Sequence, residues 1–277
     1  MSITKKKTNQ AKKSNNNHKQ LRVGKEFWGI FIKSIKDFRR NAKILIGIVM
    51  VAALPAALLA LVQAQDSTLA TYLSIFSFFM TLALIWGIAK INTGNKISIK
   101  QAYYEGTSNF IKFILVALVL ALQFIPFAVG ATILINAIAT TTIVISAWDW
   151  LILGTIWLVL AMPTFYWLSH YVFSIFEVGA NNLTPISALR TSKTVTKGRG
   201  FMIFGHFLLL LLSLILVTIL PSVLLIYLYI LTKGNQIFLS LLQLVSLLII
   251  LPIFYLYLQN FYQYLKTNGK ISSRQKN

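Results

Sequence analysis

The ionisable and nucleophilic side chains of this sequence are too few and too scattered to form an evident catalytic centre. Acid–base catalysis needs positioned titratable pairs, but the 277 residues include only six acidic residues and three histidines. The absence of cysteine excludes disulfides, thiolate nucleophiles and cysteine metal sites. No Gly-rich phosphate loop, nucleophile elbow or His-Glu metalloprotease motif is present. We therefore expect no enzymatic activity, no cofactor and no metal site.

Three polar residues are candidates for a role inside the membrane or at its interface. They are His170, His206 and Glu177, which lie within or at the end of long apolar stretches. An ionisable group in lipid is costly and by default marks function. The histidines have the chemistry for a proton relay or a ligand site, but hydrogen bonding between helices is the favoured interpretation.

Basic residues gather in two short connections between apolar stretches. We interpret them as candidates for contact with anionic lipid head groups, although a bias of positive loops toward the cytoplasm explains the same charges equally well. The candidate residues are Lys96, Lys100, Arg190, Lys193, Lys197 and Arg199.

Six apolar stretches predict an all-α polytopic membrane protein, because each reaches the roughly 20 residues that a helix needs to cross the hydrocarbon core. With 57% hydrophobic and 12% charged residues, the chain lacks the polar surface of a soluble globular protein. The predicted transmembrane helices are residues 43–64, 69–91, 110–138, 150–176, 201–231 and 237–265.

The distribution of positive charge predicts the orientation of these helices. All Lys and Arg residues except Lys233 lie at the two ends of the chain or around alternate connections. Positively charged segments stay in the cytoplasm, so we expect both termini there and the protein in the inner or plasma membrane. The net charge of +20 is then explained by topology and anionic lipid, and nucleic acid is not an expected partner.

The ends of the chain are predicted to lie outside the six-helix membrane domain, which covers residues 25–265. Residues 1–24 are rich in Lys, Asn and Gln, which predicts a disordered basic cytoplasmic tail. Residues 25–41 place apolar side chains at helical spacing beside basic ones, which predicts an interfacial helix. Residues 266–277 are expected to form a cytoplasmic C-terminal tail.

A repeated capping pattern indicates three structural repeats. Ser98 with Gln101, and Ser272 with Gln275, fit a capping box, and Thr184 before Pro185 fits an N-cap with proline at the first helical position. A short cytoplasmic helix is therefore predicted after each even transmembrane helix. The repeat unit is an interfacial helix followed by a transmembrane hairpin.

Short segments of the chain resemble one bacterial family. They are residues 176–179, 185–192 and 196–199, together with the opening segment 34–41. They resemble the six-helix membrane domain associated with some glycerophosphodiester phosphodiesterases, and related YciC-type proteins of unknown function. The resemblance implies six helices and a membrane location. It transfers no catalytic residue, because the phosphodiesterase site of that family lies in a separate soluble domain.

The expected function is that of a non-enzymatic integral membrane protein that organises lipid or envelope, or acts as a membrane scaffold. The expected partners are the lipid bilayer and its anionic head groups, and a second membrane protein is a further candidate. A transporter or permeation pathway is the alternative, because prolines interrupt five of the six stretches. An intramembrane enzyme is the third hypothesis and requires at least two of His170, His206, Glu177 and Arg190 to share one pocket.

The topology predicts which introduced cysteines react with a membrane-impermeant thiol reagent added outside the cell. Cysteines at Ser67, Ser146 and Asn235 should be labelled, because these connections carry almost no positive charge and are translocated. A cysteine at Ser192 should react only after the cells are permeabilised. The opposite pattern of labelling would overturn the assigned orientation.

Overall fold

The computed structural model describes the backbone of residues 3–61, 66–140, 147–232 and 236–274. Side chains are described for residues 24–59, 68, 71–72, 75–137, 148–219, 222–232 and 244–267. Within these ranges the protein is all-helical and has no strand. The helices are α1 (Ile3–Leu61), α2 (Asp66–Asn92), α3 (Ile99–Thr107), α4 (Phe110–Gln123), α5 (Ile125–Thr140), α6 (Ala147–Tyr171), α7 (Ser174–Asn181), α8 (Pro185–Thr196), α9 (Gly200–Leu231) and α10 (Gln236–Arg274).

Five helical segments of the described chain are long and apolar enough to cross a membrane, and a sixth is added if the bent pair α3 and α4 is counted as one span. The fold class is therefore that of a multi-pass, all-helical membrane protein. The five segments are Gly24–Leu59, Ile75–Asn92, Trp148–Asn181, Gly200–Leu231 and Leu244–Thr267.

The third predicted span, residues 110–138, is not one continuous helix. It divides into α4 and α5 at Phe124, two residues before Pro126. Proline has no N–H to continue the helical ladder and its ring crowds the preceding turn. The Thr164 hydroxyl of α6 donates to the backbone carbonyl of Gln123 at 2.9 Å, and so satisfies an acceptor at the break.

The predicted helix at residues 25–41 is continuous with the first span and forms part of α1. The junction is a kink at Asn41, whose φ of −118° and ψ of 16° are not helical. Phe27 and Phe31 are buried, and their ring centroids lie 5.3 and 6.3 Å from that of Tyr257 on α10. The apolar face of this segment thus packs against protein.

Both ends of the chain are more helical than the sequence predicts. α1 begins at Ile3, inside the segment predicted to be disordered, where Lys and Gln are good helix formers. α10 continues to Arg274, so no separate helix begins at Ser272. The third predicted cap is therefore wrong, because the preceding helix simply runs on.

The other two predicted caps are present. The backbone N–H of Gln101 donates to Ser98 Oγ at 3.1 Å at the start of α3. Thr184 occupies the N-cap of α8 and Pro185 the first turn, although the Thr184 side chain makes no capping bond to the helix backbone. These positions fix where the two short helices begin.

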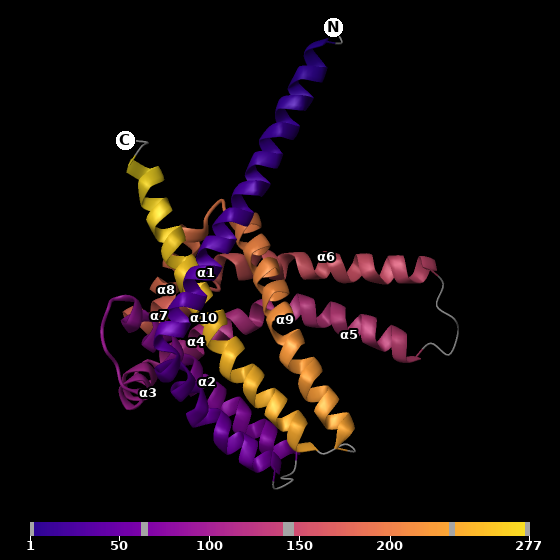
Figure 1. The fold of residues 1–277 in the computed structure, drawn as a ribbon. Helices are drawn as coiled ribbons and strands as arrows, with labels where there is room; N and C mark the ends of the chain where they lie inside the picture. The colour runs from indigo at the N-terminus through magenta and orange to yellow at the C-terminus, as the bar shows by residue number, and fades with distance from the viewer. Residues whose placement is uncertain (1–2, 62–65, 141–146, 233–235, 275–277) are drawn as a thin grey trace.

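Figure 1 shows how the helices are arranged. α1 runs alongside α10, and α2 and α9 flank them toward the bottom of the view. α5 and α6 lie side by side and project to the right, away from this group. The helix pairs thus spread from a common region that contains α3, α7 and α8.

Gly106 permits α3 to lie directly against the backbone of α2. A Cβ at this buried position of α3 would lie 2.9 Å from both Ala83 Cα and the Leu82 carbonyl oxygen of α2. Backbone atoms cannot give way as a flexible side chain does, so α3 packs on α2 only with glycine here.

We expect Gly106→Ala to destabilise the protein by roughly 1–3 kcal/mol, because the added methyl must separate α2 and α3. Gly29→Ala is the matched control, since a Cβ there meets nothing within 4 Å. The measurement is thermal unfolding of both purified variants in one detergent. Equal midpoints for the two variants would contradict the proposed packing.

Candidate functional site

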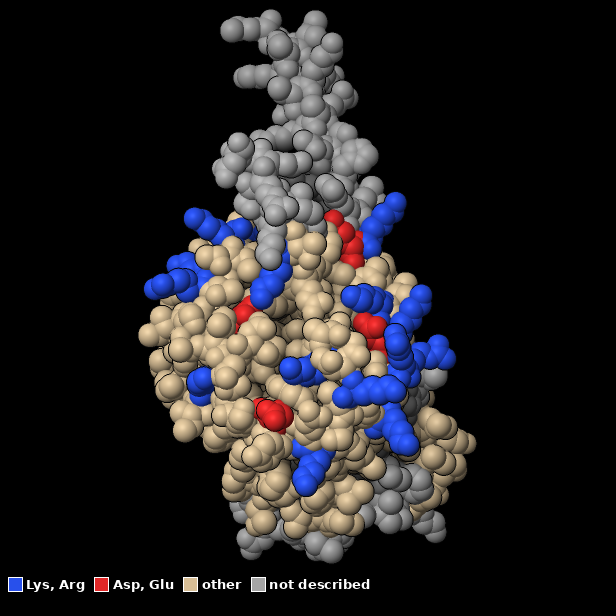
Figure 2. All heavy atoms as spheres, turned by 90° about the vertical axis from the view of Figure 1, so that its left-hand side faces the viewer, with Lys and Arg blue, Asp and Glu red and all other residues tan. Residues whose placement is uncertain are grey.

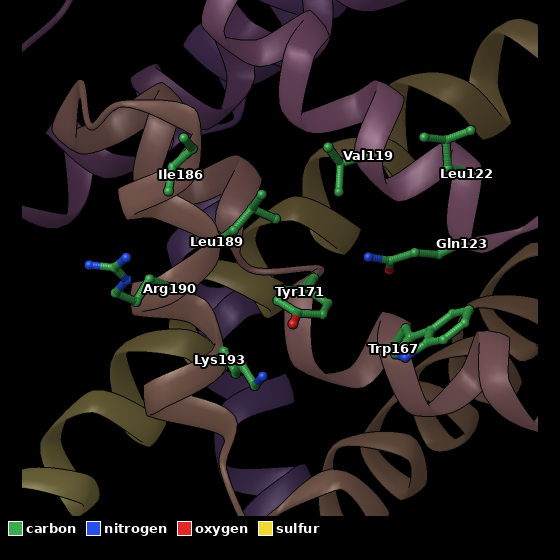
Figure 3. Close-up of a pocket in the computed structure, with 9 residues that line it drawn as sticks. All are labelled: Val119, Leu122, Gln123, Trp167, Tyr171, Ile186, Leu189, Arg190 and Lys193. Atoms are coloured by element: carbon green, nitrogen blue, oxygen red, sulfur yellow. The ribbon is translucent and has the colours of Figure 1, made fainter.

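A pocket with a volume of about 670 Å³ lies between α4, α6 and α8. Its walls combine apolar side chains with four polar ones, and no acidic residue lines it. The lining residues, shown in Figure 3, are Val119, Leu122, Gln123, Trp167, Tyr171, Ile186, Leu189, Arg190 and Lys193.

Hydroxyl groups dock α8 against the end of α6 and so position one wall of the pocket. Ser192 and Thr196 are buried one turn apart, and both donate to the backbone carbonyl of His170, at 2.7 and 3.2 Å. His170 Nδ1 lies 3.1 Å from Thr196 Oγ1. Another face of α8 then presents Leu189 and Lys193 to the pocket.

Gln123 ends α4 and forms part of the opposite wall. Its side-chain oxygen Oε1 is buried and has no hydrogen-bond partner among the described residues. Figure 3 shows the Gln123 amide, the Tyr171 hydroxyl and the Lys193 side chain directed toward the gap, whereas the Arg190 guanidinium points away from it. Of the two atoms of this amide, the nitrogen lies toward the gap in Figure 3, so Gln123 offers the pocket a hydrogen-bond donor.

The predicted basic residues do not form one cluster. Arg190 and Lys193 line the pocket, and Lys197 is exposed after the end of α8. Arg199 instead donates from Nη1 to the Leu265 carbonyl at 3.1 Å, which ties the start of α9 to α10. This structural bond was not predicted from the sequence.

Lys96 and Lys100 lie apart from the pocket, at the connection between α2 and α3 and in the first turn of α3, and both are exposed. Figure 2 shows Lys and Arg spread over the face of the molecule that carries these connections, with few acidic residues among them. This surface is suited to anionic lipid, whose attraction is about 1 kcal/mol per nearby cation.

Glu177 has a structural environment at the junction of α7 and α10. It is buried, pairs with Lys266, and accepts hydrogen bonds from Tyr262 and from Asn181 Nδ2, the latter at 2.7 Å. Its Oε1 therefore joins α7 to α10, and its Oε2 bonds within α7.

His206 is also committed to packing. Its Nδ1 donates to the Met202 carbonyl at 2.9 Å, and its ring stacks on Phe261 with centroids 4.3 Å apart. Nε2 is buried and has no partner among the described residues. His206 and Glu177 do not line the pocket, and of the four residues considered for an intramembrane enzyme only Arg190 does.

The described residues contain no group of three or more His, Asp or Glu side chains placed to hold a metal ion. Sequence reasoning missed Gln123, Trp167 and Tyr171 as pocket residues. Of these three, only Gln123 could have been singled out from the sequence, because it is a polar amide within the apolar stretch 110–138.

Comparisons with protein-family models, with curated proteins and with solved structures find no match for this chain. The predicted family resemblance therefore remains a hypothesis.

We expect Glu177→Gln to destabilise the protein by about 1–3 kcal/mol, because it leaves Lys266 without its carboxylate at a buried junction. This loss is smaller than for a fully buried ion pair, because Lys266 is partly exposed to solvent. Glu105→Gln on the exposed face of α3 removes the same charge and should have almost no effect. Chemical unfolding in detergent compares the two variants. A loss of similar size in both would show that total charge, not this contact, is responsible.

Proposed function

We propose that this chain is a non-enzymatic integral membrane protein that holds anionic lipid at its basic face and thereby organises the surrounding membrane. The observation that supports it most directly is the position of Arg190 and Lys193 beside an apolar pocket. Cations attract lipid phosphates, and the adjoining apolar wall suits acyl chains. Exposed Lys96, Lys100 and Lys197 extend the same electrostatic attraction.

The proposal includes the finer architecture predicted from the sequence. We place six transmembrane segments in three hairpin repeats, with both termini in the cytoplasm of the inner or plasma membrane. The alternation of charge supports this orientation, and the packing of α1 on α2, α5 on α6 and α9 on α10 is compatible with three hairpins. Exposed Trp28 and Ile32, beside Lys33, suit an interfacial position for this part of α1.

We also propose a family for this chain and a membrane-protein partner. Membership in the six-helix family associated with glycerophosphodiester phosphodiesterases is consistent with a membrane domain that has no catalytic site of its own. A membrane-protein partner fits the scaffold role, with the apolar faces of α5 and α6 as available contact surfaces.

A transporter of a small molecule or lipid is the second candidate function. The observation in its favour is the interruption between α4 and α5 beside the pocket, because discontinuous helices often form transport sites. Uptake or flipping of a labelled lipid by reconstituted vesicles distinguishes this candidate from a static lipid-binding role.

We expect the protein, purified in a mild detergent, to retain a higher proportion of anionic lipid than the membrane from which it came. Replacing Arg190, Lys193 and Lys197 together by Gln should reduce this enrichment, because electrostatic attraction scales with the number of cations. Mass spectrometry of extracted lipids provides the measurement. Lipid in the bulk proportion, or robust substrate turnover by the pure protein, would contradict the proposal.

A further inference from the structure

We propose that the projecting pair α5 and α6 contains a hinged arm whose angle to the rest of the protein follows the thickness of the bilayer. The arm is the hairpin made of residues 125–137 in α5 and 148–160 in α6. Its hinge lies at the base, beside Pro126 and Pro163. This inference assigns a movement to one part of the membrane domain and does not depend on the binding of anionic lipid.

The two helices of the arm pack closely on each other. A Cβ at Gly130 of α5 would lie 3.2 Å from Trp157 Cδ1 and 3.3 Å from Leu160 Cβ of α6. The rings of Phe127 and Trp157 meet edge to face, with centroids 5.5 Å apart. Interdigitated side chains resist relative displacement, so the arm moves as one unit.

The arm buries little against the remaining helices. Among its described residues only Gly130 is buried, whereas Ala161, Thr164, Ser169 and His170 are all buried in the next ten residues of α6. Figure 1 shows the corresponding separation, with α5 and α6 projecting away from α9 and α10. A segment with few buried contacts outside itself changes position at low free-energy cost.

The base of the arm is fastened to three other helices. The Thr164 hydroxyl donates to the Gln123 carbonyl of α4 at 2.9 Å, and the Phe165 ring contacts Phe204 of α9 with centroids 5.3 Å apart. The hydroxyls of α8 bond the His170 carbonyl. Residues 164–170 therefore belong to the fixed part of the molecule.

Both helices of the hairpin carry a proline where the fixed part meets the arm. In α5, Pro126 follows the break at Phe124, and in α6, Pro163 directly precedes the fastened Thr164. The bond between Thr164 and the Gln123 carbonyl brings these two points together. Because proline has no N–H and bends a helix, both helices are weakened at the same level.

The tip of the arm is suited to remain at the membrane surface. Trp148 and Trp150 flank Asp149 at the start of α6 and are 74% and 46% exposed. Tryptophan side chains anchor helix ends at the membrane–water interface. With the base fixed and the tip held at the interface, a change in bilayer thickness is met by a change of tilt.

The test measures the distance between the arm and α9 by double electron–electron resonance. The chain contains no cysteine, so two introduced cysteines carry the only spin labels. Gly154→Cys places one label on the arm, where a Cβ meets nothing within 4 Å. Leu216→Cys places the other on α9, at a side chain that is 61% exposed. The full chain is studied in phosphatidylcholine nanodiscs of short or long acyl chains.

We expect the distance from Gly154 to Leu216 to become shorter in the thicker bilayer, because a more upright arm lies closer to α9. Both positions lie about 17 Å along their helices from the contact at the base, so a rotation of about 20° changes their separation by roughly 5 Å. The pairs Leu54 with Leu216 and Gly154 with Ile133, within the fixed part and within the arm, should keep their distances.

Proline variants locate the hinge. Pro126→Ala and Pro163→Ala restore a backbone N–H, and together they should narrow the distance distribution and reduce its response to thickness. Pro55→Ala in α1 is the matched control, because that proline also lies inside a helix but outside the arm. Thermal unfolding midpoints within the range of the wild type establish that the variants are folded.

Three results would overturn the inference. The first is a distance from Gly154 to Leu216 that is the same in both bilayers. The second is an equal change between Leu54 and Leu216, which would mean that the whole helix group deforms. The third is an unchanged response in the variant that lacks Pro126 and Pro163. None of these results bears on anionic lipid, because the nanodiscs contain only zwitterionic lipid.

Discussion

Aromatic packing along α10 is the interaction that holds α1, α9 and the start of α7 together. Tyr257 packs on Phe27 of α1, Phe261 on His206 of α9, and Tyr262 on Phe173 beside α7. These rings are nearly or completely buried, and each aromatic pair is stabilising by about 0.5–1.5 kcal/mol beyond its buried area. One helix thus provides the surface on which the first, middle and last parts of the chain meet.

Polar contacts complete this arrangement at the ends of the helices. Glu177 and Lys266 join α7 to α10, and Arg199 bonds the Leu265 carbonyl one residue earlier. The His170 carbonyl accepts from two hydroxyls of α8. Because the hydroxyl groups of α8 have protein partners, α8 is held in place and Lys193 is presented to the pocket.

The parts of this structure that were predicted correctly depend on short-range sequence. The Ser98 cap requires only a hydroxyl three residues before Gln101, and a span requires only a sufficiently long apolar run. The break at Phe124 was not predicted, because proline in a membrane helix either bends or interrupts it according to its neighbours. Thr164, whose hydroxyl bonds the free carbonyl at this break, is 41 residues away in sequence.

The site was predicted only in part for the same reason. Arg190 and Lys193 were selected from a local run of positive charge, and the same reasoning did not predict that the Arg199 guanidinium bonds the Leu265 carbonyl. Gln123, Tyr171 and Trp167 belong to two helices that meet only in the folded chain. The bond from Thr164 to the Gln123 carbonyl also connects the end of α4 to α6. α6 in turn packs along α5. The same helix, α6, therefore both lines the pocket and carries the projecting pair.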